Sequence, residues 1–170
     1  DFIPIAETNG LICEIGDWCL KQALSQAKIW NEQLPSHEKV TVAVNVSSLQ
    51  FNQSDFAQHI IGITQDSGLP LELLELEITE SAIMEHPQQT IDELKLLRAA
   101  GIRISMDDFG TGYSSLAQLK QLPIDVLKID KSFISISLNH RSTNLSCVGC
   151  ENVFKASMRS SVVAGGLGYA

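Results

Sequence analysis

Positive charge is scarce in this chain. It has 12 lysine and arginine residues against 20 aspartate and glutamate residues, which gives a formal net charge of -8. Proteins that follow a nucleic acid backbone present a patch of cations, and no such cluster occurs here, so we expect no nucleic acid partner. A negatively charged nucleotide ligand would need metal ions or local dipoles to offset this charge.

Long apolar runs are also missing. No apolar stretch approaches the roughly 20 residues that span a bilayer, and the first residues do not show a basic segment followed by an apolar one. We therefore expect no membrane segment in this chain and a cytoplasmic location, with an inner-membrane anchor in a longer parent protein left open. Aromatic residues make up only 6% of the chain, but 44% is hydrophobic, which suits one globular domain of 170 residues.

Cysteine is limited to two distant pairs, Cys13 with Cys19 and Cys147 with Cys150. A reducing compartment would keep all of them as thiols. The C-x-x-C spacing at Cys147 is the only one that is typical of a metal site, and a structural zinc site needs two further ligands that do not follow it. Coincidence is the favoured interpretation of this spacing.

What the chain does contain is an alternation of helix-like and strand-like segments. Apolar residues recur at helical spacing, and β-branched or alternating runs lie between them. This order predicts a parallel sheet with helical crossovers, in the α/β class. The expected helices are residues 15–30, 51–65, 87–101 and 113–121, and the expected strands are 40–46, 73–78, 102–106 and 125–130. Trp18, Trp30 and Phe56 lie on apolar helix faces, so we expect them in the core.

Polar residues interrupt these strands at equivalent places. Asn45, Glu77, Asp107 and Lys128 each lie within or at the end of a strand-like run. In a parallel βα barrel the functional groups meet at the carboxyl ends of the strands. Oxygen ligands of this kind, together with Asp108, suit Mg2+ or Mn2+, and Lys128 would steady a phosphate or an attacking water. The pattern predicts a metal-assisted phosphoryl-transfer or hydrolase site.

Structural interpretations compete with this one. Glu77 could be a solvated residue of an edge strand, Asn45 could satisfy backbone groups, and Lys128 could pair with Asp130. The adjacent Asp107 and Asp108 are the strongest indication, because two neighbouring carboxylates at a strand end repel each other unless a cation or proton intervenes. The histidines, which share no spacing, are expected at the surface: His37, His59, His86 and His140.

Five short segments complete the pattern: FIPIAE at 2–7, NVS at 45–47, LEITES at 76–81, DDFGTGYSSL at 107–116 and LKID at 127–130. In this order they resemble the EAL domain family of bacterial cyclic-di-GMP phosphodiesterases, over about residues 1–136. The resemblance implies a TIM-like (β/α) barrel that cleaves one phosphodiester bond of cyclic di-GMP to give linear pGpG. It also implies two Mg2+ or Mn2+ ions as cofactors.

The same resemblance implies a role for each matching residue. Asn45, Glu77 and Asp107 match ligands of the first metal, and Asp108 matches a ligand of the second. Lys128 matches the lysine that contacts the site water. Glu80 matches a glutamate that holds the loop after Asp108, a loop that takes part in dimerisation in the family, so a homodimer is a further expectation.

The chain departs from the family at both ends. It contains no Glu-Ala-Leu triplet, whose glutamate is a metal ligand in the family, and it is shorter than the roughly 200 residues that a closed barrel needs. We expect a partial EAL domain at 1–136, truncated at its N-terminus, and a divergent tail at 137–170. Residues 162–168 match the Ala-Glu-Gly-Val-Glu motif of the family faintly, by resemblance or by chance. Glycines stand in place of its two glutamates, one of which is the family's proposed general base. A frameshift or point changes in a decayed gene would explain this tail.

Three functional interpretations follow. The chain is part of an active phosphodiesterase whose missing groups come from elsewhere, or an inactive domain that binds cyclic di-GMP or a protein partner, or a truncated product without a stable fold. For the chain acting alone we expect little or no hydrolysis.

Overall fold

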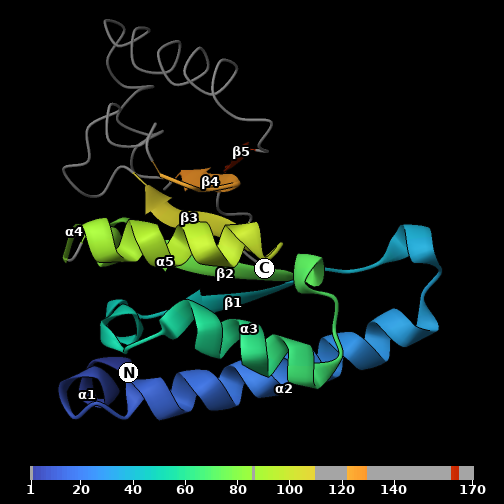
Figure 1. Ribbon diagram of the computed structural model, residues 1–170, viewed down its shortest axis with the longest axis horizontal. Coiled ribbons are helices and arrows are strands. Elements are labelled where there is room, and N and C mark those ends of the chain that lie inside the picture. Colours follow the sequence, from blue (N-terminus) through green and yellow to red (C-terminus); the bar gives the residue numbers. More distant parts are fainter. Residues whose placement is uncertain (1, 86, 110–121, 130–161, 165–170) are drawn as a thin grey trace, which may run out of the picture.

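The computed structural model describes residues 2–85, 87–109, 122–129 and 162–164. Its centre is a five-stranded sheet in the order β1-β2-β3-β4-β5, and every neighbouring pair is parallel (Figure 1). The strands are β1 (Val42–Val46), β2 (Leu74–Thr79), β3 (Arg103–Phe109), β4 (Val126–Ile129) and β5 (Val162–Ala164). Strands that follow one another in the chain are therefore neighbours in space, which is the arrangement of a βα barrel and confirms the expected α/β class.

Helices supply the described crossovers, which connect β1 to β2 and β2 to β3. Two helices precede the sheet, α1 (Ile3–Thr8) and α2 (Ile12–Gln33), and α3 (Phe56–Ser67) connects β1 to β2. Between β2 and β3 lie the short α4 (Glu80–Glu85) and then α5 (Pro87–Ala99). Short 3-10 helices occupy Ser36–Glu38, Ser48–Asn52 and Leu71–Leu73. The helix expected at 51–65 is thus a 3-10 turn followed by α3, and the one expected at 113–121 lies outside the described residues.

Glycine ends α3 where the chain must turn back toward the sheet. Gly68 has a φ of 75°, and its N–H bonds to the carbonyl of Gln65 at 3.0 Å. This left-handed conformation closes the helix at a small energetic cost only for glycine. Pro70 then leads into β2, as the sequence predicts.

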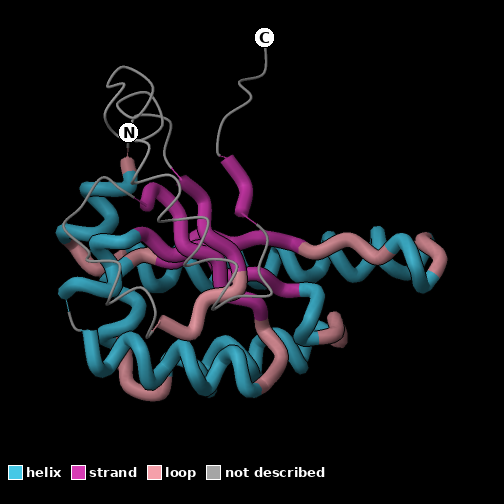
Figure 2. The backbone as a smooth tube through the Cα atoms, turned by 90° about the horizontal axis from the view of Figure 1, so that it is seen from above, coloured by secondary structure: helices cyan, strands magenta, loops and turns pink. Residues whose placement is uncertain are grey.

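The two faces of the sheet have opposite chemistry. Register pairs Val44 with Leu76 and Leu76 with Ile104, so these side chains share one face, and Leu76 and Ile104 are at most 1% exposed. They pack against α3 and α5 through residues such as Leu94 and Leu97, both fully buried. Figure 2 shows the strands gathered together with the helices along their outside. The helix-facing side of the sheet is therefore the core of the domain.

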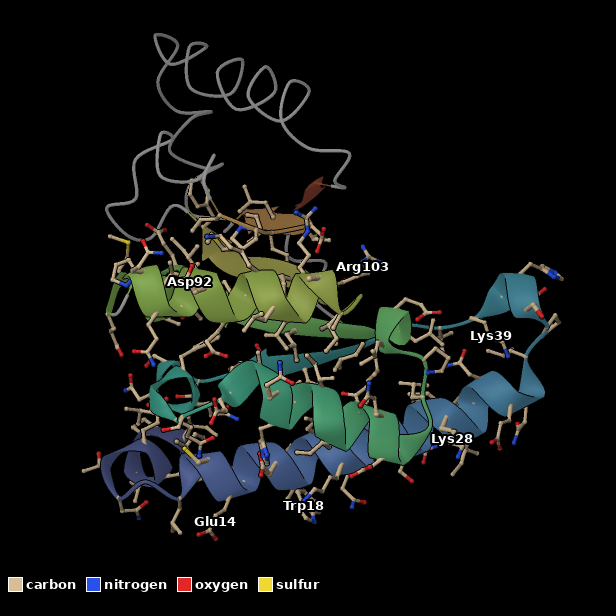
Figure 3. The ribbon with its side chains drawn as sticks, in the orientation of Figure 1. Glu14, Trp18, Lys28, Lys39, Asp92 and Arg103 are labelled. Carbon is tan, nitrogen blue, oxygen red and sulfur yellow. The ribbon has the colours of Figure 1, made fainter. Side chains whose placement is uncertain are left out.

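Two tryptophans were wrongly expected in this core. Trp18 is 62% exposed and Trp30 is 50% exposed, whereas Phe56 is fully buried as predicted. The reason is that α2 buries a different stripe: Leu20, Leu24, Ala27 and Asn31. Trp18 lies on the outer side of α2 (Figure 3), about 200° around the helix from Leu20 at 100° per residue.

No helix among the described residues is long and apolar enough to cross a membrane. The longest, α2, has 22 residues, but it carries charged residues along its length.

Candidate functional site

The face of the sheet that points away from α3 and α5 brings the predicted site residues together. Asn45 on β1 is the register partner of Glu77 on β2, so their Cα atoms are about 4.8 Å apart and their side chains share this face. Asp107 on β3 pairs with Thr79, two residues further toward the carboxyl ends and so on the same face. Lys128 lies near the end of β4. Four successive strands thus place polar groups at one edge, as the sequence predicts.

Glu77 and Lys128 form an ion pair that crosses β3, since β2 and β4 lie on either side of it. The two side chains are only 12% and 23% exposed. Glu77 is therefore not a solvated residue of an edge strand. Its strand β2 lies between β1 and β3, and the Glu77 carboxylate has a cationic partner. The alternative pairing of Lys128 with Asp130 concerns a residue outside the described part of the chain.

Beneath this ion pair lies a buried hydroxyl without a partner. Ser105 is the register partner of Glu77 on β3 and is fully buried, and its Oγ makes no hydrogen bond. A buried hydroxyl without a partner costs on the order of 1–3 kcal/mol, which a bound water or ligand atom would recover. Sequence patterns did not single out Ser105, because its role depends on register with a strand 28 positions earlier.

The donor set fits a hard divalent cation. An amide oxygen from Asn45 and carboxylates from Glu77 and Asp107 are the oxygen ligands that Mg2+ and Mn2+ prefer. In the described part of the chain, no three His, Cys, Asp or Glu side chains gather closely enough to hold a metal by themselves. A metal site here consequently needs the Asn45 amide and further groups. Asp108 follows Asp107 in β3, and its side chain lies outside what is described.

Glu80 begins α4 at the end of β2 and is 4% exposed. It therefore lies at the same edge of the sheet as Glu77 and Asp107. The loop after Asp108 that it is expected to hold, residues 110–121, lies outside the described residues, so this role and the homodimer expected through that loop stay predictions.

A second network, which the sequence analysis missed, fixes the end of β1. Ser47 Oγ donates to Glu7 Oε1 at 2.8 Å, and Gln50 Oε1 accepts from the Ser47 backbone N–H at 3.1 Å. Gln50 is itself buried against Gly16 of α2, where an added Cβ would lie 2.4 Å from Gln50 Nε2. Ser47 and Gln50 form a capping box, a local signature that could have revealed this arrangement from sequence. The network ties α1 and α2 to the strand that carries Asn45.

This network borders a cavity of about 820 Å3 beside β1. Its polar lining includes Asn45, Ser47, Glu7 and Thr79, and its remaining wall is mostly apolar. A cavity of this size with a few convergent polar groups is typical of a small-molecule site. It therefore extends the strand-end site toward α1 and α2.

No described histidine lines the site, and of the described cysteines only Cys19 lies in the wall of the cavity beside β1. Cys13 and Cys19 are free thiols, and burial, followed by the charges of Asp17 and Glu14, raises the pKa of the Cys13 thiol. The thiolate is thereby disfavoured, so Cys13 is a poor nucleophile. His37 and His59 are exposed, which confirms the expectation for these two, while His86, His140, Cys147 and Cys150 lie outside the described residues.

Comparison with known proteins gives one family. The model of the EAL domain matches residues 1–164. The chain is 44% identical over 144 residues to an uncharacterized signaling protein of Caulobacter vibrioides, a match that covers 84% of this chain and 17% of that protein. It is 43% identical over 133 residues to the cyclic di-GMP phosphodiesterase NbdA of Pseudomonas aeruginosa, covering 78% of this chain and 17% of that protein.

Solved structures agree with this result. The MucR phosphodiesterase in complex with cyclic di-GMP superimposes with a TM-score of 0.83 at 37% identity, covering 99% of this chain and 67% of that one. BlrP1 of Klebsiella pneumoniae, solved with manganese and cyclic di-GMP, has a TM-score of 0.70 at 24% identity over 92% of this chain and 37% of that one, and shows the fold alone. The chain spans about a fifth of the length of the curated relatives it matches.

Proposed function

Because this chain belongs to the EAL domain family, we propose that the carboxyl ends of β1 to β4 bind cyclic di-GMP together with divalent cations. The observation that carries the proposal is the gathering of Asn45, Glu77, Asp107 and Lys128 at one edge of a parallel sheet. Relatives named as cyclic di-GMP phosphodiesterases, and the MucR complex with that ligand, support the choice of cyclic di-GMP.

Each residue has a defined part in this proposal. Asn45, Glu77, Asp107 and Asp108 hold Mg2+ or Mn2+, which would supply neutralisation of charge at the phosphodiester. The ammonium of Lys128, already beside Glu77, steadies the phosphate or the attacking water. Glu80 orders the loop after Asp108, through which we also propose a homodimer. The acidic chain has few cations of its own to offer, so the metal ions offset the repulsion of a doubly charged ligand.

Hydrolysis to pGpG belongs, in this proposal, to the longer protein rather than to this chain alone. The sequence has no Glu-Ala-Leu triplet and has Gly165 and Gly168 where the family has glutamates. The parallel pairing of β5 with β4, together with a family match to residue 164, favours the resemblance at 162–168 over coincidence. We also propose that the partial EAL domain ends at Ile136, that residues 137–170 are a divergent tail, and that the protein is located in the cytoplasm.

The test is binding and turnover measured on the same sample. The purified chain is titrated with cyclic di-GMP in Mn2+ by calorimetry, and the products are separated by chromatography after a long incubation. We expect saturable, chelator-sensitive binding that Glu77→Gln weakens, and no pGpG. Binding that persists in excess chelator would contradict the proposal, and metal-dependent formation of pGpG would overturn its division between chain and parent.

A folding control accompanies this test, because a truncated product without a stable fold would also fail to bind. A cooperative thermal transition in circular dichroism is expected for the free chain. Its absence would identify the third interpretation and separate it from a folded domain that does not bind.

A further inference from the structure

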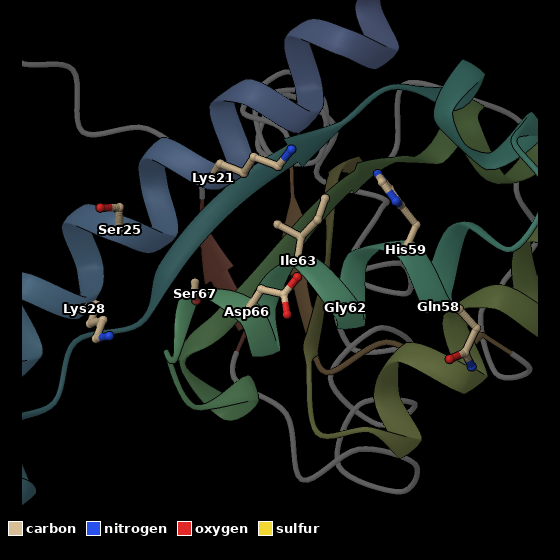
Figure 4. Close-up of a pocket in the computed structure, with 9 residues that line it drawn as sticks. All are labelled: Lys21, Ser25, Lys28, Gln58, His59, Gly62, Ile63, Asp66 and Ser67. Carbon is tan, nitrogen blue, oxygen red and sulfur yellow. The ribbon is translucent and has the colours of Figure 1, made fainter.

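A groove between α2 and α3 lies away from the strand-end site. It has a volume of about 660 Å3 and is lined only by residues of these two helices (Figure 4). Lys21 and Lys28 come from α2, and Gly62, Ile63 and Asp66 come from α3. The volume falls in the range of about 300–1,000 Å3 that is typical of small-molecule sites.

The groove collects the cations that the rest of the fold leaves without partners. Lysines and arginines elsewhere in the described chain each contact a carboxylate or a carbonyl: Lys39, Lys95, Arg98, Arg103 and Lys128. Lys21 and Lys28 are the remaining cations among the described residues, and neither makes a hydrogen bond or an ion pair there. In a chain of net charge -8, this groove has two lysines and one carboxylate, that of Asp66, in its lining, so its local charge is positive.

Two glycines keep this groove open. An added Cβ at Gly62 would meet no atom within 4 Å, so the space in front of the middle of α3 is empty. At Gly68 an added Cβ would lie 3.0 Å from Lys28 Nζ, so the missing side chain leaves room for that ammonium at one end. At the other end, His59 Nε2 contacts Asp17 Oδ2 at 2.7 Å and links α3 to α2. Lys28 and His59 thus lie at opposite ends of the groove (Figure 4).

We propose that this groove binds a small ligand that carries phosphate groups, of the nucleoside diphosphate class. Lys21 and Lys28 are two helical turns apart, about 10 Å along α2, and their long side chains can reach one diphosphate between them. Lysine is a common phosphate ligand that acts as a point charge. Ile63 offers an apolar wall to a ring, and Asp66 can accept hydrogen bonds from sugar hydroxyls. An acidic peptide has no sugar hydroxyls that could donate hydrogen bonds to Asp66.

The test is a titration of the full isotope-labelled chain, followed by amide shifts in NMR spectra, with GDP, inorganic pyrophosphate and guanosine as probes. We expect saturable shifts at Gly62, Ile63 and Lys28 with GDP, weaker ones with pyrophosphate and none with guanosine. Lys21→Gln and Lys28→Gln should each weaken GDP binding about tenfold. Lys95→Gln removes the same charge from a paired lysine on α5, so it serves as the matched control and should leave affinity unchanged.

Two further variants keep the outcome interpretable. Gly62→Met fills the empty wall without changing charge and should abolish the shifts. Glu77→Gln, which alters the strand-end site, should leave them intact, so a failure of the proposed function and a failure of this inference are distinguishable. Equal losses with Lys95→Gln and Lys21→Gln, or shifts produced by a polyglutamate peptide and not by GDP, would overturn the inference.

Discussion

The two faces of the sheet have the same backbone and opposite tasks. On the helix-facing side, Leu76 and Ile104 lie among aliphatic residues of α3 and α5 and are almost fully buried. On the other side, the same two strands carry the register partners Glu77 and Ser105. Glu77 forms an ion pair with Lys128, and the buried hydroxyl of Ser105 has no hydrogen-bond partner. The first face stabilises the fold, and the second keeps polar groups that the fold does not need. Substitutions on the first face should therefore affect stability, and substitutions on the second should affect binding.

The largest expected effect comes from the helix-facing side. Leu76→Ala should lower the free energy of unfolding by about 2–5 kcal/mol, because it removes buried methyl groups and leaves a cavity. Ser105→Ala is the matched change on the opposite face, and loss of its unpaired hydroxyl should be neutral or slightly stabilising. Urea denaturation measures both. Equal destabilisation by the two variants would contradict the division between the faces.

A smaller loss is expected where α2 supports the end of β1. Gly16→Ala places a Cβ 2.4 Å from Gln50 Nε2, which should cost about 1–3 kcal/mol through displacement of the Gln50 side chain. Gly62→Ala is the control, since it also adds a methyl group to a helix but into open space. It should stabilise the chain by up to about 1 kcal/mol through helix propensity. Thermal denaturation of the two variants should therefore shift in opposite directions.

On the polar face the effect should appear in binding instead. Glu77→Gln should weaken Mn2+ binding by at least about tenfold. Mutation of a residue that only hydrogen-bonds to a metal ligand already lowers metal affinity by this factor. Glu75→Gln lies two residues toward the amino end on the same face, paired with Arg103 at 3.7 Å, and should leave Mn2+ affinity unchanged. Calorimetry of both variants compares them, and a similar loss from Glu75→Gln would indicate a general effect of charge.

The smallest effect is expected on the outer surface of α5. Hydrogen bonds from Gln88 and Lys95, in that order, lower the pKa of Asp92. A lowered folded-state pKa contributes stability above the unfolded value of about 3.9, and that stability is lost as the pH falls through the folded value. Gln88→Ala should thus reduce stability slightly at neutral pH, and the reduction should shrink as the pH falls below about 3.9. The pH dependence of the melting temperature checks it.

Much of this organisation could be predicted from the sequence, because helix and strand periods are local. Alternating segments gave the parallel sheet, and Asn45, Glu77, Asp107 and Lys128 were recognised by their positions in strands. The pairing of Glu77 with Lys128 was missed, since two residues 51 positions apart on non-adjacent strands carry no local signal. α1 and α4 were missed because six residues are too few to show a helical period.

The exposure of Trp18 and Trp30 was missed for a different reason. α2 has apolar residues on more than one side, and periodicity alone does not say which side meets the sheet. The buried stripe that begins at Leu20 was settled by contacts with β1 and α3. Tertiary packing, rather than local pattern, made that choice.

The proposed function depends above all on a divalent cation bound at the carboxyl ends of β1 to β4. Paramagnetic broadening of amide signals by substoichiometric Mn2+ locates such a cation in the chain itself. We expect broadening that is strongest at Asn45, Glu77 and Asp107 and that declines toward Val42 and Leu74 at the amino ends of β1 and β2. The broadening should disappear in Glu77→Gln. Broadening centred on another part of the fold, or unchanged by Glu77→Gln, would contradict the proposed function.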